Sequence, residues 1–563
     1  MDSRVKRWLE RDPDPETRAE LQGLADAGDQ EAIAEHFAER LAFGTAGLRG
    51  TYGPGPSRMN RLVVRETTAG LGAYLLDTIS DARQRGVVIG YDARRGSRVF
   101  AEDASCVLVG LGIKVHLTHK EQPTPICPFA VKQFAAAAGV VITASHNPPE
   151  YNGYKVYWEN GAQIIPPHDT GIAAAIEHAA QGPIPWMELD EALNAGGIIL
   201  LKNDVVESYL HGMRELSIHA ADSLRSEMAV AYTPLHGVGG GIALQALERA
   251  GFKRVFVVAE QRDPDGRFPT VLFPNPEEPG AMDLVLALAG EVGADLVFAN
   301  DPDADRLAVA VPATDGQYRM LTGDQVGVLL GADILEAATE PITVVTTIVS
   351  SRMLEAMARE AGADYVEALT GFKWIVNRGL AREDEGFRFA YGYEEALGYT
   401  VGSLVPDKDG ISAMVAFAEM AAALRRKDMT VLGRLEELYR RYGYHLTAQR
   451  SLSLGPGASA GIINSQLRAS SPHSVARRSV ESILDLQAET DSGFPKSDVL
   501  VYKLEGGARI VIRPSGTEPK IKCYYEVCEA IAPGRSFAEA ERSAHASLDR
   551  LIVIHQKELS SLI

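Results

Sequence analysis

The stretch Ala294-Asp-Leu-Val-Phe-Ala299 is followed at once by Asn300-Asp-Pro-Asp-Ala-Asp-Arg306. The apolar run predicts a buried strand, so the carboxylates of Asp301, Asp303 and Asp305 should gather in the loop at its end. Three carboxylates that close together need a cation or strong hydrogen-bond donors to remain ionised. The stretch therefore predicts an α/β sheet that ends in a site for a hard divalent metal. Such a metal suits phosphoryl chemistry.

Size and composition narrow the class of protein. A chain of 563 residues is too long for one core and predicts about three to five domains. Hydrophobic residues make up 46% and charged residues 23%, as in ordinary globular proteins. The formal net charge of −19 argues against nucleic-acid or membrane binding as the main activity, although a local basic site for an anionic substrate remains open.

The first residues and the cysteines indicate a compartment. The charged start, Met-Asp-Ser-Arg-Val-Lys-Arg-Trp, lacks the apolar stretch of a signal peptide, and no apolar run approaches the ~20 residues of a membrane span. The cysteines show no zinc-type pairing and are interpreted as buried free thiols. They are Cys106, Cys127, Cys523 and Cys528. We expect a cytoplasmic protein.

Strands alternate with helices in a pattern that occurs three times after an acidic, helical segment of residues 1–42. This alternation predicts three similar α/β domains with mixed, mainly parallel sheets. The last ~115 residues differ, because two β-rich runs enclose a tight loop and a charged helix follows. They predict an α+β domain. The expected domains are residues 1–207, 208–322, 323–446 and 447–563.

In each of the three copies a late strand leads into an unusual polar loop. Ligands bind outside the carboxyl ends of strands in parallel sheets, so we expect the loops to converge on one central cleft. The loops are Thr143-Ala-Ser-His-Asn-Pro-Pro149, Asn300–Arg306 and Gly392-Tyr-Glu-Glu-Ala-Leu-Gly398.

Ser145 is the candidate nucleophile. Pro148 and Pro149 prevent a helix, so the loop should be stiff and present Ser145 with His146 beside it. A serine in such a loop can accept a phosphoryl group or act as a nucleophile. A simple turn at a strand end is the alternative, and the lack of a G-x-S-x-G elbow weakens a hydrolase triad.

The acidic loop has its own alternatives. An EF-hand is rejected, because its sixth and twelfth positions require Gly and Glu and hold Arg306 and Pro312 here. An aspartyl-phosphate phosphatase and a solvated acidic turn remain open. Mg²⁺ suits the metal role, since it favours a few carboxylates together with a phosphate oxygen.

Other short segments carry candidate binding groups. Arg513-Pro-Ser-Gly-Thr517 combines a basic head with small residues, and such a turn can cradle a phosphate. Gly237-Val-Gly-Gly-Gly241 lacks the full dinucleotide spacing and is interpreted as close packing or a turn. Lys155 could serve as a general acid/base or phosphate ligand, and Glu394 and Glu395 could accept hydrogen bonds from sugar hydroxyls.

Taken together, these loops resemble the α-D-phosphohexomutase family of phosphoglucomutases and phosphomannomutases. The matching pieces occur in the family's order across nearly the whole chain. They are Thr143–Pro148, Asp301-Pro-Asp-Ala-Asp-Arg306, Gly392-Tyr-Glu-Glu395 and Arg513–Thr517. The opening Gly44-Thr-Ala-Gly-Leu-Arg-Gly50 looks most like the branch that includes glucose-1,6-bisphosphate synthase and phosphopentomutase.

The resemblance implies four domains around one cleft and a role for each matching residue. Ser145 would be the phosphoserine, and Asp301, Asp303 and Asp305 would hold Mg²⁺ together with an oxygen of that phosphoserine. The catalytic group would further include Arg49, Lys155 and His146, the last two as candidate acid/base groups. The substrate would contact Arg306, Gly371, Lys373, Glu394, Glu395, Lys408, Arg513, Ser515, Gly516 and Thr517.

The predicted function is a Mg²⁺-dependent mutase that interconverts hexose 1- and 6-phosphates, most simply those of glucose. It would work through the phosphoserine and a sugar 1,6-bisphosphate, as a monomer or homodimer. One departure concerns specificity, because Ala396 stands where many members have a serine after the first sugar-loop glutamate. Mannose or pentose phosphates as substrates, a metal-dependent sugar phosphatase and a non-catalytic sugar-phosphate binding protein are the alternatives.

Overall fold

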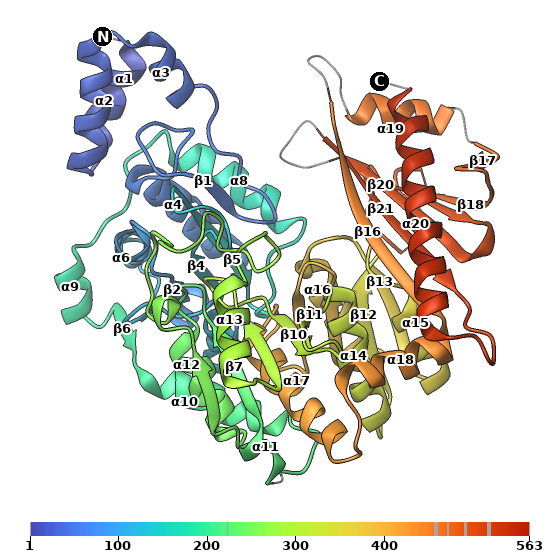
Figure 1. The fold of residues 1–563 in the computed structure, drawn as a ribbon. Coiled ribbons are helices and arrows are strands. Elements are labelled where there is room, and N and C mark those ends of the chain that lie inside the picture. The colour runs from blue at the N-terminus through green and yellow to red at the C-terminus, as the bar shows by residue number, and fades with distance from the viewer. Residues whose placement is uncertain are drawn as a thin grey trace. The chain divides into compact units, whose positions relative to one another are not determined.

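The computed structural model describes residues 2–221, 223–454, 460–469, 472–488, 493–514 and 520–561. The chain divides into two compact units (Figure 1). Unit 1 comprises Met1–Met320 and Gly398–Ala423, and unit 2 comprises Leu321–Leu397 and Leu424–Ile563. Among the described residues, no helix combines the length and the apolar character that crossing a bilayer requires.

The first sheet of unit 1 has the strand order β1-β5-β4-β2-β3-β6. Strands β2, β3, β4 and β6 are parallel, whereas β5 pairs antiparallel with both β4 and β1. Every residue of β2 and β4 is buried, which is typical of central strands with both faces covered. The strands are β1 (Leu48–Thr51), β2 (Val87–Tyr91), β3 (Val115–Thr118), β4 (Ala138–Ile142), β5 (Tyr151–Trp158) and β6 (Ile198–Leu201).

Helices cover this sheet, and three more precede it. Asn60 starts α4, because its side chain accepts a hydrogen bond from the backbone N–H of Val63 at 2.9 Å. The preceding helices are α1 (Ser3–Arg11), α2 (Pro15–Ala27) and α3 (Gln30–His36). The others are α4 (Arg61–Thr78), α5 (Ala82–Arg85), α6 (Ser97–Gly110), α7 (Ile126–Phe134), α8 (His168–Ala179), α9 (Leu189–Asn194) and α10 (Asn203–Glu215).

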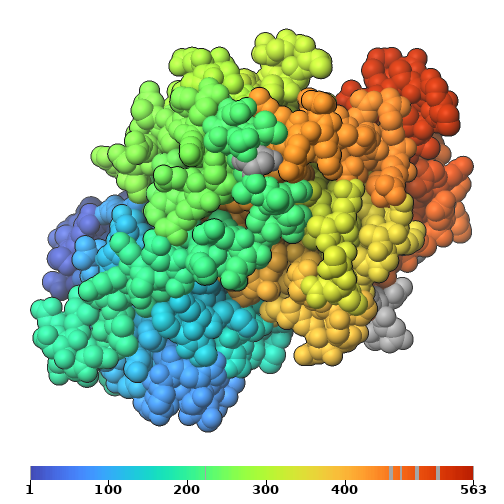
Figure 2. Space-filling model, turned by 90° about the horizontal axis from the view of Figure 1, so that it is seen from below, coloured from blue at the N-terminus to red at the C-terminus, as the bar shows by residue number. Residues whose placement is uncertain are grey.

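The second sheet of unit 1 has the order β11-β10-β9-β7-β8 and mixes parallel with antiparallel pairs. Figure 2 shows the surface of the parts of the chain that carry the first sheet (blue to teal) and the second sheet (green). The strands are β7 (Ala229–Thr233), β8 (Arg254–Val257), β9 (Leu296–Ala299), β10 (Ala308–Pro312) and β11 (Tyr318–Met320). The helices are α11 (Leu224–Glu227), the short 3-10 helix η1 (Ala259–Gln261), α12 (Gly240–Arg249) and α13 (Asp283–Val292).

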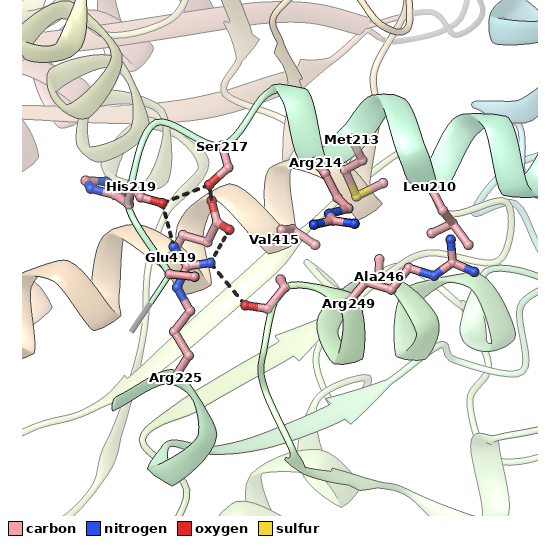
Figure 3. Close-up of a pocket in the computed structure, with 12 residues that line it drawn as sticks. Leu210, Met213, Arg214, Ser217, His219, Arg225, Ala246, Arg249, Val415 and Glu419 are labelled. Atoms are coloured by element: carbon pink, nitrogen blue, oxygen red, sulfur yellow. Dashed lines mark hydrogen bonds and ion pairs between the residues drawn. The ribbon is translucent and has the colours of Figure 1, made fainter. Parts of the chain in front are cut away.

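A late segment of the chain also belongs to unit 1. It contains β15 (Gly398–Val401) and α17 (Gly410–Arg425) up to Ala423. Figure 3 shows how α17 is held beside α10 and α11: Glu419 accepts hydrogen bonds from Arg225 at 2.5 Å and from Ser217 at 2.7 Å. Arg225 and Glu419 are both buried, so removing either partner would leave an uncompensated charge in the interior.

Unit 2 begins with the third sheet, in which β13, β12 and β14 are parallel neighbours. Thr322 and Gln325 form a capping box at the start of α14. The strands are β12 (Ile342–Thr347), β13 (Asp364–Ala368) and β14 (Arg388–Glu394). The helices are α14 (Gly323–Ala337), α15 (Met353–Ala361), α16 (Phe372–Glu383) and α18 (Val431–Tyr442).

The C-terminal sheet of unit 2 is antiparallel, with the order β16-β21-β20-β19-β18-β17. Helix α20 packs on β16 and β21 and runs along this sheet (Figure 1). The strands are β16 (Tyr444–Ser453), β17 (Ser474–Val475), β18 (Arg478–Asp485), β19 (Leu500–Leu504), β20 (Ala508–Pro514) and β21 (Lys520–Glu529). The helices are α19 (Ala460–Ala469), the short η2 (Glu505–Gly507) and α20 (Phe537–Ser560).

The predicted fold class is confirmed: three α/β segments with mixed, mainly parallel sheets precede an antiparallel α+β segment. Strands expected at residues 139–142, 295–298 and 342–346 lie at 138–142, 296–299 and 342–347. The predicted domain boundaries and the central cleft stay predictions.

Candidate functional site

Ser145 lies in the loop that follows β4. Its backbone N–H donates a 2.8 Å hydrogen bond to the side chain of Thr143. Its φ of +53° lies in the left-handed region, where a residue other than glycine is uncommon and often marks a functional site. The side chain is almost entirely buried, with 3% of the residue exposed. The sequence expectation of a stiff loop that presents Ser145 therefore agrees with the observed backbone.

Arg94 fixes this loop and was not anticipated from the sequence. It is buried in the loop after β2 and lies 3.2 Å from Asp92. Its guanidinium donates to the carbonyls of Ser145 at 2.5 Å, Asn147 at 2.6 Å and Pro148 at 2.7 Å. A planar group with five N–H donors can hold several carbonyls at once. One sequence feature could have indicated Arg94: the segment Asp92-Ala-Arg94 comes directly after β2, a buried strand next to β4.

The acidic loop after β9 meets Ser145. The hydroxyl of Ser145 donates a 2.9 Å hydrogen bond to Oδ2 of Asp301, and the backbone N–H of Arg306 donates to Oδ1 at 3.0 Å. Asp301, Asp303 and Asp305 are all buried, and ligand atoms of the three lie within 4.8 Å of one another. The structure thus brings together two segments that are 156 positions apart in the chain.

Glycines let the loop between β7 and α12 approach the acidic loop closely. A Cβ atom on Gly237 would lie 2.5 Å from the backbone of Pro302, and one on Gly239 would lie 2.4 Å from the Cβ of Ala304. Val238 donates its backbone N–H to the carbonyl of Pro302 at 2.8 Å. The interpretation of this glycine-rich segment as close packing is confirmed at these positions.

Two lysines neutralise the carboxylates. Lys155 donates to Asp303 at 2.7 Å and to Asp305 at 3.0 Å, and Lys408 lies 3.4 Å from Asp305. The antiparallel register between β5 and β4 places Lys155 opposite Val141, next to the end of β4. Lys408, predicted to contact the substrate, lies beside the carboxylates in the late segment of unit 1.

Thr124 is a further contact that sequence reasoning missed. Its hydroxyl donates to Oδ2 of Asp303 at 2.6 Å, and its backbone N–H donates to the carbonyl of Asp303 at 2.8 Å. Nothing in the sequence singled it out, because a threonine before a helix is an ordinary start signal.

The electrostatics suit a bound cation. Burial, together with Asp303 and Asp305, raises the pKa of Asp301 well above its usual value. Burial alone would raise the pKa of Asp303 as well, but Lys155 outweighs it and the pKa is lowered. Asp303 and Asp305 each keep one buried carboxylate oxygen, Oδ1, with no hydrogen-bond partner among the described residues. Clustered carboxylates with spare oxygens are the donor set that a hard divalent cation takes.

Three other predicted residues lie around Ser145 and Asp301. Nδ1 of His146 is 3.2 Å from the Ser145 hydroxyl, and burial with nearby Arg306 and Arg49 holds the pKa of His146 well below its usual value. Arg49 is on β1 and donates to the side chain of Asn147 at 2.9 Å. The Arg306 side chain lies 3.3 Å from Glu277.

In unit 2, Glu394 ends β14 and Glu395 follows it, both partly exposed. Glu395 accepts hydrogen bonds from the hydroxyls of Ser350 at 2.9 Å and Thr347 at 3.1 Å. Burial and the neighbouring Glu394 raise the pKa of Glu395 to about 7. Glu394 and Glu395 therefore lie at the carboxyl end of a parallel strand, but this strand extends to Glu394, whereas it was predicted to end at Ala390.

Arg513, one of the predicted phosphate-binding residues, contacts a second loop of unit 2. It donates a hydrogen bond to the hydroxyl of Thr370, which precedes Gly371 at the start of α16. Lys373 lies in the first turn of the same helix. Nε of Arg513 is buried and has no partner among the residues described. Ser515, Gly516 and Thr517 lie outside the described residues.

Comparison with known proteins identifies the family to which the chain belongs. Models of the phosphoglucomutase/phosphomannomutase α/β/α domains I, II and III match residues 40–182, 207–315 and 322–442. The model of the C-terminal domain matches residues 466–541. The chain belongs to the phosphoglucomutase/phosphomannomutase family. Members of this family are phosphosugar mutases, that is, intramolecular phosphotransferases, so the chain is an enzyme of that class.

Three similar proteins illustrate the range of the family. A probable phosphoribomutase of Schizosaccharomyces pombe is 39% identical, with 96% of this chain and 95% of that protein covered. The human phosphopentomutase is 36% identical, covering 96% and 93%. The human glucose 1,6-bisphosphate synthase is 34% identical, covering 94% and 90%.

A solved structure shares the fold. The open form of the Paramecium protein parafusin, a phosphoglucomutase, superposes with a TM-score of 0.72 at 19% identity. The match covers 93% of this chain and 96% of that chain.

Proposed function

We propose that this enzyme moves a phosphoryl group between the two ends of a sugar phosphate through a phosphoserine at Ser145. The observation that carries the proposal is the 2.9 Å hydrogen bond between the Ser145 hydroxyl and Asp301, within a cluster of three buried carboxylates. A serine held this way next to a cation site can take up and release a phosphoryl group, because such transfer depends mainly on positioning and charge neutralisation.

The transfer consists of two displacements on one serine. In the first, a sugar hydroxyl attacks the phosphorus of phosphorylated Ser145, the Oγ–P bond breaks, and a sugar bisphosphate forms. In the second, Ser145 attacks the other phosphate of the bisphosphate and is phosphorylated again. In each step the attacking hydroxyl loses a proton and the departing oxygen gains one. His146, whose Nδ1 lies 3.2 Å from the Ser145 hydroxyl, and Lys155, which donates to Asp303 in the same cluster of side chains, are the groups proposed to exchange these protons.

Asp301, Asp303 and Asp305 would hold Mg²⁺, since three carboxylates with two spare buried oxygens match its preference for oxygen ligands. When bound, the metal neutralises charge that develops on the transferred phosphoryl group. Lys155 and Lys408 already balance part of the carboxylate charge and would share this role. If the sugar bisphosphate leaves before the second displacement, Ser145 remains unphosphorylated, and a sugar 1,6-bisphosphate, or its pentose equivalent, would be needed to phosphorylate it again.

Residues of unit 2 would bind the rest of the substrate. Glu394 and Glu395 offer carboxylate oxygens to sugar hydroxyls. Arg513, whose buried Nε has no described partner, suits the phosphate that does not react. The proposed set of contacts is completed by Arg49, Arg306, Gly371, Lys373, Ser515, Gly516 and Thr517.

The sugar is the open part of the proposal. The resemblance predicted glucose phosphates, and relatives named glucose 1,6-bisphosphate synthase agree with a hexose. Relatives named phosphopentomutase and phosphoribomutase, at 36% to 39% identity over at least 92% of their length, support a pentose phosphate. Ala396 also removes a hydroxyl that could select among hexoses. We therefore propose ribose 1-phosphate as a substrate alongside glucose 1-phosphate, with ribose used at least as well.

An isomerisation assay tests both the proposed mutase activity and the proposed choice of sugar. Purified enzyme with Mg²⁺ and a bisphosphate primer is given ribose, glucose, mannose and glucosamine 1-phosphates, and the isomeric product and inorganic phosphate are measured. A mutase yields the isomer without net phosphate release. Release of phosphate in proportion to substrate consumed would support the phosphatase alternative, and binding without either product would support a non-catalytic protein. Higher kcat/KM for glucose than for ribose would reject the pentose preference only.

Ser145→Ala tests the nucleophile. The variant should lose at least about 10⁴-fold in turnover, because the Ser145 hydroxyl is the one that contacts Asp301, whereas the other hydroxyl of the loop, on Thr143, accepts the backbone N–H of Ser145. Mass spectrometry of the wild type after incubation with the bisphosphate should find the phosphate on Ser145. Ser465→Ala, at an exposed position on α19, is the matched control and should keep full activity. Turnover of Ser145→Ala near the wild-type level would rule out the phosphoserine.

A further inference from the structure

Cys528 differs from the other cysteines of the chain. Cys106, Cys127 and Cys523 are buried, and burial raises the pKa of Cys106 and Cys523 to about 12. Cys528 is only partly buried and lies near the end of β21. The interpretation of the cysteines as buried free thiols is therefore wrong about burial at Cys528.

The Cys528 thiol contacts a histidine, which in turn contacts a glutamate. Its sulfur lies 3.4 Å from Nε2 of His445, and Nδ1 of His445 lies 2.9 Å from Oε1 of Glu526. The register of β16 and β21 pairs His445 directly with Cys528, so the contact follows from the sheet itself. A nucleophile, a base and a carboxylate that orients the base form the arrangement that activates cysteine nucleophiles.

Glu526 holds His445 in one orientation. The carboxylate is buried and is further bound by Arg509 at 2.9 Å, Arg352 at 3.2 Å and the backbone N–H of Arg352 at 2.8 Å. Burial alone would lower the pKa of His445, but its contacts with Cys528 and Glu526 outweigh burial and raise the pKa to about 9. The imidazole can therefore keep the proton that the thiol gives up.

The thiol also lies at a constrained point of the chain. Gly443, with φ of +95°, connects α18 to β16, and a Cβ atom on it would lie 2.6 Å from the sulfur of Cys528. The glutamate behind the thiol contacts Ser351 and Arg352 before α15 as well as strands of the C-terminal sheet. An atom added to the sulfur would thus alter the junction between the third and the C-terminal sheets of unit 2.

We propose that Cys528, next to His445 and Glu526, is a nucleophile and a site of covalent modification by hydroperoxides. The sulfur attacks one peroxide oxygen, an S–O bond forms and the O–O bond breaks, so that sulfur is oxidised by two electrons to a sulfenic acid. The departing hydroxide of hydrogen peroxide, or the alkoxide of an organic hydroperoxide, takes the proton held by His445 and leaves as water or as the alcohol. Cys523 lies five residues along the same strand, about 16 Å away, too far to close a disulfide with Cys528.

The first experiment measures nucleophilicity, independently of mutase turnover. The full chain reacts with iodoacetamide at pH 7, and the alkylation rate of each cysteine is followed by peptide mass spectrometry. Cys528 should react at least about 10-fold faster in the wild type than in His445→Gln, because an isolated thiol is only a few per cent thiolate at this pH. The same cysteine in the urea-unfolded wild type is a reference that needs no variant, and it should also react more slowly.

The second experiment tests the oxidation itself. After treatment with hydrogen peroxide, dimedone should label Cys528 in the wild type, label it at least about 10-fold less in His445→Gln, and leave position 528 unlabelled in Cys528→Ser. Cys523→Ser is the matched control and should be labelled at Cys528 like the wild type. Equal rates in the wild type, His445→Gln and the unfolded chain, or no dimedone adduct at Cys528, would overturn the proposal.

Discussion

The acidic loop of unit 1 and the glutamate loop of unit 2 use carboxyl groups in opposite ways. In unit 1 three buried aspartates meet two lysines, and Lys155 lowers the pKa of Asp303 against the effect of burial. In unit 2 Glu395 accepts hydrogen bonds from neutral hydroxyls, and burial with Glu394 raises its pKa to about 7. The first loop keeps the Asp303 carboxylate ionised, whereas the Glu395 carboxyl group of the second loop can gain or lose a proton near neutral pH.

This contrast matches the proposed functions of the two loops, which are phosphoryl transfer for the acidic loop and sugar recognition for the glutamate loop. Phosphoryl transfer requires the same charge balance for every sugar, so its groups can be buried and locked by several contacts each. Recognition of hydroxyls depends on a few polar contacts at a partly exposed surface, where one substitution shifts the preference. Substitutions in unit 1 should therefore abolish turnover for every sugar, while those in the glutamate loop should change stability or choice of sugar.

Asp303→Asn should have the largest effect among these tests. It removes the charge that pairs with Lys155 and one of the spare oxygens, so affinity for Mg²⁺ should fall at least about 100-fold and turnover by about 10²–10³-fold. Calorimetric titration with Mg²⁺ measures the binding directly. Asp315→Asn, in an exposed turn, is the control. Unchanged Mg²⁺ affinity in the Asp303 variant would place the metal elsewhere.

Arg94→Lys should come next, with kcat lowered about 100-fold and KM little changed. Lysine keeps the charge but cannot hold several carbonyls of the Ser145 loop, so the nucleophile would be misplaced. Steady-state kinetics separate the two constants. Arg98→Lys, on the exposed side of α6, serves as the control. A rise in KM without a fall in kcat would mean that Arg94 binds substrate instead of positioning Ser145.

Glu395→Gln should change how stability depends on pH. The folded-state pKa of about 7 exceeds the unfolded value near 4.5, so the folded wild type binds more protons between these values and loses stability as pH rises through the window. The variant lacks this loss. Its free energy of unfolding relative to the wild type should therefore increase by about 1–3 kcal/mol from pH 5 to pH 8.

Urea unfolding at both pH values, followed by circular dichroism, measures this difference. Glu385→Gln, at an exposed position before β14, is the control and should show no such trend. A difference that stays constant or shrinks as pH rises would show that Glu395 is ionised across the window.

Ala396→Ser should have the smallest effect and tests the recognition role of the glutamate loop directly. A new hydroxyl in the glutamate loop can add one hydrogen bond to a hexose, worth about 0.5–1.5 kcal/mol. The ratio of kcat/KM for glucose 1-phosphate over ribose 1-phosphate should therefore rise about 2- to 10-fold. Turnover with the preferred sugar should stay within about 2-fold. An unchanged ratio would mean that position 396 does not contact the sugar.

Much of the site could be predicted from local sequence. The run before Asp301 and the run before Ser145 are apolar and bounded by turn residues, so both read as buried strands with ligands at their ends. Lys155 and Arg49 were singled out only by short motifs. β5 runs antiparallel to its two neighbours β4 and β1, and no periodic pattern distinguished β5 or β1 from loops.

Arg94, Thr124 and Lys408 show where local reasoning ends. Each contacts the site through its position in the fold: Arg94 through the loop after β2, Thr124 before α7, and Lys408 through a late segment that packs into unit 1. Cys528 and His445 meet in the same way, because 83 positions of chain separate them and only the register of β16 and β21 sets them opposite each other.

Most of the strands, the order of the polar loops and the chemical types of their side chains could be predicted, since buried runs, turn residues and clustered carboxylates are local features. Which side chains meet could not be predicted in this way. Distances between residues far apart in the chain depend on strand pairing and on the packing of whole layers, and these follow from the burial of the complete sheets.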